Sequence, residues 1–196
     1  MYKKQMIAQK VLCLAAIFVS ALVFLYSLGI MTDLYDSLYS TMRNPNDLFQ
    51  TSVPGSIVYY NMQEFNRVFL VCSIGLILLA VLLFITNTHT RRRYYIGNYF
   101  ATAAYAVAGV ALSVFAHSYI EVFKAQFLQV DFEALKEHAE MWGMLYTEST
   151  FWFDAHYGVF CLVLLVSVLL VANAIWKASL MKQEAKLVAQ GRGAEA

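Results

Sequence analysis

Four long stretches without a charged side chain constrain this sequence more than any other feature. They cover residues 11–32, 68–90, 94–120 and 155–176. A helix needs about 20 mostly apolar residues to cross a hydrocarbon core of about 30 Å. Because 60% of the chain is hydrophobic and only 14% is charged, it is too apolar for an ordinary soluble domain, which is about half apolar. The sequence therefore predicts an all-α integral membrane protein, residues 1–196, with four transmembrane helices in a single domain.

The charged residues are divided unevenly between the segments that join these helices. The termini and the short turn between the second and third helices hold ten of the 14 basic residues, but only two of the 13 acidic ones. The two long loops, residues 33–67 and 121–154, hold the other eleven acidic residues. Basic residues favour the cytoplasmic side of a membrane. We therefore expect a plasma-membrane protein with both termini and the short turn inside, both long loops outside, and a cytoplasmic tail at residues 177–196. The basic residues of the short turn are Arg91, Arg92 and Arg93.

The third predicted helix carries small residues on two adjacent stripes. Helix pairing in lipid gains nothing from the hydrophobic effect, so close approach through small side chains is what brings helices together. We expect this helix to be the central packing element. Spacing alone leaves open whether the stripes face helices of the same chain or a second subunit. The first stripe is Thr102, Ala106, Gly109, Ser113 and Ala116, and the second is Ala101, Ala104, Ala108 and Ala111.

The second long loop contains the pattern of an amphipathic helix. Five apolar residues follow one another at steps of four, three, four and three, and mostly acidic residues fill the other faces, with Asp131 as the expected N-cap. Helices that lie on membranes usually carry basic residues instead. We therefore expect this helix to pack on the outer ends of the bundle or on a partner protein. Its apolar residues are Leu128, Phe132, Leu135, Ala139 and Trp142.

Ionisable side chains gather near the predicted outer ends of the third and fourth helices. His117 and Glu121 are one turn apart, and Asp154 and His156 stand where the fourth helix begins. Imidazole and carboxylate groups would suit a divalent metal ion or a proton-handling site, whereas ordinary polar capping of helix ends is the competing interpretation. A haem with two axial histidines needs both of them at a similar depth in the membrane. Among the histidines of the predicted spans, only His117 and His156 are predicted to lie on the same side of the membrane.

The sequence contains no motif of a known catalytic class. It has no phosphate-binding glycine loop, no Gly-x-Ser-x-Gly and no zinc-protease helix motif. The predicted spans contain no charged residue of the kind that ion-coupled carriers place at the midplane. These features favour a non-catalytic subunit that associates, through its helices and outer loops, with a larger membrane complex such as a transporter.

Two alternative functions remain open at this point. One is a metal- or haem-binding redox protein that uses the histidines and carboxylates described above. The other is a homo-oligomeric small transporter or channel, with Asn98, Tyr105 and Ser113 lining a pathway between protomers. The expected partners in all three cases are membrane lipids and other membrane subunits, in a hetero- or homo-oligomer, and not nucleic acid.

Overall fold

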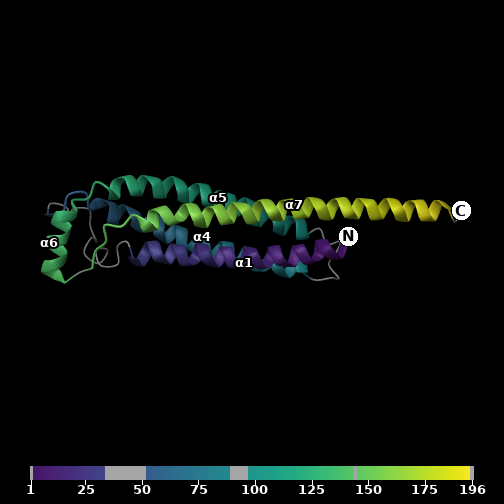
Figure 1. Ribbon diagram of the computed structural model, residues 1–196, viewed down its shortest axis with the longest axis horizontal. Coiled ribbons are helices and arrows are strands. Elements are labelled where there is room, and N and C mark those ends of the chain that lie inside the picture. Colours follow the sequence, from purple (N-terminus) through teal and green to yellow (C-terminus); the bar gives the residue numbers. More distant parts are fainter. Residues whose placement is uncertain (1, 34–51, 89–96, 144, 195–196) are drawn as a thin grey trace. The chain divides into compact units, whose positions relative to one another are not determined.

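The computed structural model describes residues 2–33, 52–88, 97–143 and 145–194. Within them the chain forms helices and no strands (Figure 1). Four of these helices are long and apolar enough to cross a membrane. The chain is therefore an all-helical protein of the integral membrane type, as the four uncharged runs predict. The helices are α1 (Tyr2–Asp33), α4 (Ile57–Thr88), α5 (Gly97–Phe127), α6 (Phe132–Trp142) and α7 (Phe151–Ala194).

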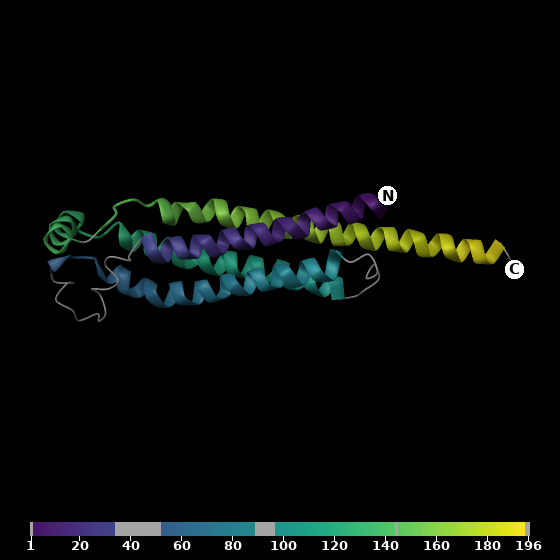
Figure 2. The same cartoon turned by 90° about the horizontal axis from the view of Figure 1, so that it is seen from below.

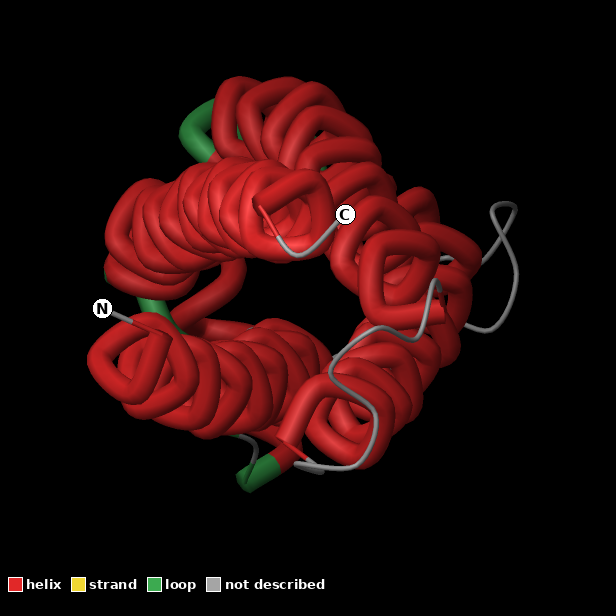
Figure 3. The backbone as a smooth tube through the Cα atoms, turned by 90° about the vertical axis from the view of Figure 1, so that its right-hand side faces the viewer, coloured by secondary structure: helices red, strands yellow, loops and turns green. Residues whose placement is uncertain are grey.

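The packing divides the chain into two compact units. Unit 1 contains Met1–Ser20, Leu76–Val110 and Leu162–Ala196, and unit 2 contains Ala21–Gly75 and Ala111–Cys161. Each unit therefore contains a segment of every long helix. Figure 3, viewed from the right-hand side of Figure 1, shows that the regular elements of the described residues are helices. That the whole chain is one domain stays a prediction.

The long helices extend beyond the uncharged runs of the sequence. α1 begins at Tyr2 instead of residue 11, α4 begins at Ile57 instead of residue 68, and α5 ends at Phe127 instead of residue 120. An uncharged run marks only the part of a helix that suits hydrocarbon. The helix itself continues into the interface for as long as its backbone hydrogen bonds can be made and no proline interrupts them. The loops predicted at residues 33–67 and 121–154 are correspondingly shorter.

α7 departs most from its predicted bounds of 155–176. It has 44 residues and continues through most of the expected tail, including Gly191 and Gly193. Its C-terminal part projects past the start of α1 within unit 1 (Figures 1 and 2). Lys177 is consequently a residue in the middle of a helix rather than the first residue of a tail.

The core of unit 2 is aromatic. Phe65 of α4 lies with its ring centroid 5.5 Å from that of Tyr119 and 5.8 Å from that of Phe115, both on α5. Tyr59 meets Phe127 at 6.2 Å. Because an earlier residue of α4 pairs with a later residue of α5, these two helices run antiparallel in unit 2. Aromatic pairs at such distances contribute about 0.5–1.5 kcal/mol each beyond the area that they bury.

The core of unit 1 contains a network of amide side chains. Gln9 of α1 donates to Asn87 of α4 at 2.8 Å, and it accepts from Asn173 of α7 at 2.7 Å and from Gln5 at 2.9 Å. Hydrocarbon offers no hydrogen-bond partners, so polar side chains in a spanning helix must satisfy one another. The network therefore ties α1, α4 and α7 together within unit 1.

Candidate metal centre

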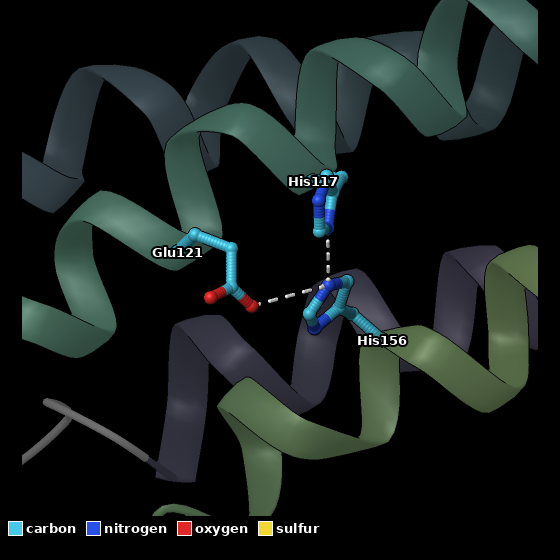
Figure 4. Close-up of side chains that lie close together, drawn as sticks. All are labelled: His117, Glu121 and His156. Atoms are coloured by element: carbon cyan, nitrogen blue, oxygen red, sulfur yellow. Dashed lines mark hydrogen bonds and ion pairs between the residues drawn. The ribbon is translucent and has the colours of Figure 1, made fainter.

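Three of the four predicted metal ligands come together in unit 2. His117 and Glu121 lie on successive turns of α5 and so project from the same face of the helix, and His156 lies near the start of α7 (Figure 4). One possible ligand atom from each of these residues lies within 4.8 Å of the other two. Two helices that are separate in the sequence thus supply one cluster.

The imidazole of His156 is held in one tautomer by the backbone. The residue is only 1% exposed, and its Nδ1 contacts the carbonyl oxygen of Phe153, three residues earlier in the same helix. A carbonyl can only accept a hydrogen bond, so Nδ1 carries the proton and Nε2 presents its lone pair. Metal-binding histidines typically have this arrangement, because a hydrogen bond from the outer nitrogen fixes the orientation of the ring.

The lone pair of His156 faces the other two candidate ligands. Its Nε2 is 2.9 Å from Nδ1 of His117 and 3.7 Å from Oε1 of Glu121 (Figure 4). Without a metal, the Nδ1–H of His117 donates to that lone pair. The carboxylate of Glu121 is oriented in turn by Tyr157, whose hydroxyl donates to Oε1 at 2.7 Å. Tyr157 is a member of the cluster that sequence reasoning missed, since nothing in its spacing pairs it with Glu121.

These distances fit a tetrahedral metal site better than a haem. Bonds of about 2.0–2.1 Å to nitrogen or oxygen in a tetrahedron place neighbouring ligand atoms roughly 3.3 Å apart. The observed separations of 2.9 and 3.7 Å lie on either side of that value, so small side-chain rotations would suffice. A bis-histidine haem needs one imidazole on each side of the porphyrin plane. Two nitrogens already at hydrogen-bonding distance leave no room for that plane.

Asp154, the fourth predicted ligand, has other partners. Its Oδ1 lies 2.5 Å from Nζ of Lys124, and its Oδ2 accepts a hydrogen bond from the hydroxyl of Thr150 at 2.8 Å. A negative charge in the first turn of a helix is also favourable because it faces the positive end of the helix dipole. Asp154 therefore stabilises the start of α7, and the ligand cluster consists of His117, Glu121 and His156.

The small residues of α5 occupy two environments. All five residues of the first stripe, from Thr102 to Ala116, are buried. A Cβ atom added to Gly109 would lie 3.0 Å from Cγ1 of Val163 and 3.2 Å from Oγ of Ser167, so α5 and α7 approach closely in unit 1. The second stripe is mixed: Ala101 is buried, Ala108 is half-buried, and Ala104 and Ala111 are exposed.

Some of the residues predicted to bind a partner are buried within the chain, and others are exposed. On α6, Leu135 is fully buried and Ala139 is 2% exposed, and the ring of Phe132 lies 5.2 Å from that of Phe127 at the end of α5. Leu128 is 59% exposed. This face of α6 therefore packs largely on the chain itself. The side chain of Trp142 lies outside the described residues, as do the topology residues Arg91, Arg92 and Arg93.

The residues proposed to line a pathway between protomers lie inside the protein. Tyr105 is fully buried and its hydroxyl donates to the carbonyl oxygen of Ala16 at 3.2 Å, and Asn98 and Ser113 are 3% and 5% exposed. A surface shared between two copies of the chain would not include them in this packing.

The chain matches no protein-family model, no curated protein and no solved structure. Its function is therefore inferred from the geometry of its own residues.

Proposed function

We propose that this integral membrane protein binds a divalent transition-metal ion of the zinc class through His117, Glu121 and His156. The observation that carries the proposal is the buried imidazole of His156, whose Nδ1 contacts a backbone carbonyl and whose Nε2 faces the other two residues. Two nitrogen ligands and one oxygen ligand suit zinc and its neighbours. Magnesium and calcium prefer oxygen ligands alone.

The bound ion would be exchangeable. Three protein ligands leave one position of a tetrahedral ion for water, which is typical of open sites and not of closed structural ones. His117 is exposed and Glu121 is half-exposed, so an ion can enter without unfolding of the helices. In the predicted orientation of the chain, this cluster of ligands lies outside the cytoplasm. A site of this kind suits a protein that senses an external metal ion or transfers it to a partner.

Cobalt binding to the purified full-length protein in mild detergent tests this proposal. Tetrahedral Co²⁺ with nitrogen ligands gives visible absorption bands, which Zn²⁺ should abolish by displacement. We expect Glu121→Gln and His156→Ala to remove the bands. Tyr157→Phe should weaken the affinity by about 10- to 100-fold, which is the usual effect of losing a hydrogen bond to a metal ligand.

His138→Ala is the matched control for this experiment. His138 belongs to α6 and lies outside the cluster. The variant should therefore bind Co²⁺ like the original protein. Absence of the bands from the original protein, or equal losses in His138→Ala and Glu121→Gln, would contradict the proposal.

A second function, as a non-catalytic subunit of a larger membrane complex such as a transporter, has separate support. Met141 is 77% exposed and Leu145 is 84% exposed, and both lie outside the candidate spanning helices. Lipid can cover exposed apolar side chains within a span, and a partner protein can cover those beyond it. Native mass spectrometry of the protein extracted in mild detergent tests this role, and a lone monomer would contradict it.

A further inference from the structure

Lys177 is a buried cation in unit 1. It lies on α7 and is 5% exposed, although the sequence places it at the start of a cytoplasmic tail. Its Nζ lies 5.5 Å from the ring centroid of Tyr99. Positive charge is needed on the cytoplasmic side to orient a membrane protein, but exposed lysines meet that need. Orientation alone therefore gives no reason for this lysine to be buried.

Among the described residues, Lys177 forms no ion pair with a carboxylate. Burying an ammonium group is costly unless an opposite charge and hydrogen bonds compensate for the lost water. The carboxylates of Glu64, Asp154 and Glu121 pair with Arg67, Lys124 and His156, respectively. Asn173, one helical turn away, already donates to Gln9. The face of the Tyr99 ring attracts the desolvated ammonium group, but this attraction is smaller than the cost of burying an ion.

The rest of unit 1 would attract an anion from outside the chain. Its segments contain ten basic residues and only two acidic ones. Five further basic residues of the unit are exposed: Lys3, Lys4, Lys10, Lys182 and Lys186. Together they give this end of the protein a positive field. Lys177 differs from them because it is buried and its ammonium group lies over the ring of Tyr99 on α5.

We propose that Lys177 binds the phosphate group of an anionic phospholipid at the end of unit 1. The neighbouring Trp176 is 41% exposed, and tryptophan favours the depth of the lipid headgroups. The flexible four-carbon stem lets the ammonium group extend toward that depth without a change in the backbone. Anionic lipids are the abundant phosphate-bearing anions at the inner surface of a plasma membrane. The site is independent of the proposed metal centre.

Native mass spectrometry of the full chain counts the lipid molecules that stay bound to the folded protein. The protein is reconstituted with phosphatidylcholine alone, or with phosphatidylcholine and phosphatidylglycerol, and then released for measurement. We expect retained phosphatidylglycerol on the original protein. Lys177→Met should lower its affinity by about tenfold or more, as expected for the loss of a charge-assisted hydrogen bond. Lys177→Arg should retain the lipid, because it keeps the charge.

Lys186→Met is the matched control, because it removes one exposed positive charge from the same helix. It should change the affinity for phosphatidylglycerol much less than Lys177→Met does. Equal effects of these two variants would overturn the proposal in favour of a general surface charge. Inorganic phosphate is added to the phosphatidylglycerol-bound protein in detergent as a further arm. Displacement of phosphatidylglycerol by millimolar phosphate would show that the site selects a free anion, which would also overturn a lipid site.

Discussion

Two consecutive carbonyl groups at the start of α7 fix individual side chains of unit 2. The carbonyl oxygen of Trp152 accepts a hydrogen bond from the hydroxyl of Tyr26 at 2.7 Å, and that of Phe153 contacts Nδ1 of His156. A carbonyl oxygen has two lone pairs, so it can serve the helix and a side chain at once. The same turn of α7 thus holds α1 in place and sets the tautomer of the candidate metal ligand.

Gly29 is a position where α1 has no room for a side chain. A Cβ atom there would overlap the ring of Trp152, whereas one at Gly75 would meet nothing within 4 Å. We expect Gly29→Ala to lower the free energy of unfolding by about 1–3 kcal/mol, because overpacking forces neighbours to move. Gly75→Ala should leave it unchanged or raise it by up to about 1 kcal/mol, since alanine favours a helix. Denaturation by sodium dodecyl sulfate in mixed micelles measures both, and equal stabilities of the two variants would contradict the expectation.

The sequence identifies three residues of the candidate site, but it also includes Asp154 and omits Tyr157, for a physical reason. His117 and Glu121 are four residues apart, so a helix must place them on one face. Asp154 and His156 are two residues apart, and a helix that includes both turns them to different faces. The uncharged run suggests that the helix starts at residue 155, but it starts at Phe151. Asp154 therefore meets Lys124, and Tyr157, which has no periodic signal, meets Glu121.

At the scale of elements, helix existence follows from hydropathy, whereas helix ends do not. The four apolar runs predict α1, α4, α5 and α7 because hydrocarbon leaves the backbone no alternative to internal hydrogen bonds. Their ends depend on contacts between segments distant in the sequence. Lys177 illustrates this: only the continuation of α7 beyond residue 176 places it inside unit 1. A lysine directly after an uncharged run predicts an exposed tail, so the sequence does not indicate that Lys177 is buried.

α6 depends on its two caps more than the long helices depend on theirs. It has 11 residues, and a helix so short is marginal without packing and capping. Oδ1 of Asp131 accepts a hydrogen bond from the backbone N–H of Ala134 at 3.0 Å, and Gly143 ends the helix with φ of 63°. We expect Asp131→Ala to cost about 1 kcal/mol of local stability. Hydrogen exchange of the α6 amides should accelerate correspondingly, by roughly fivefold.

Lys136→Ala is the control for that measurement, because Lys136 is an exposed residue of α6 that makes no cap. The α6 amides of the Lys136→Ala variant should exchange at nearly the same rate as those of the original protein. If Asp131→Ala also exchanges at the original rate, packing of Leu135 and Ala139 alone holds the helix. In that case the caps contribute little.

At the scale of the whole molecule, the two units differ in chemistry. Unit 1 joins its helices through amide hydrogen bonds and its segments are basic, whereas unit 2 packs aromatic rings and its segments contain eleven of the 13 acidic residues. The charge difference between segments is readable in the sequence. The amide network is not, because it joins Gln5 and Gln9 of α1 to Asn87 of α4 and Asn173 of α7, and only tertiary packing decides how these three helices are rotated about their axes.

The same charge difference predicts the orientation of the chain in a membrane. The basic segments of unit 1 should face the cytoplasm and the acidic segments of unit 2 the opposite side. The exposed Cys72 and Cys161 are first replaced by alanine, and the buried Cys13 is kept. A single cysteine is then placed at Glu148 or at Gln190, both of which are exposed. In intact cells a membrane-impermeant maleimide should label position 148 and not position 190, and inverted membrane vesicles should reverse this pattern. Labelling of position 190 from outside the cell would mean that His117, Glu121 and His156 face the cytoplasm and meet the metal ions available there.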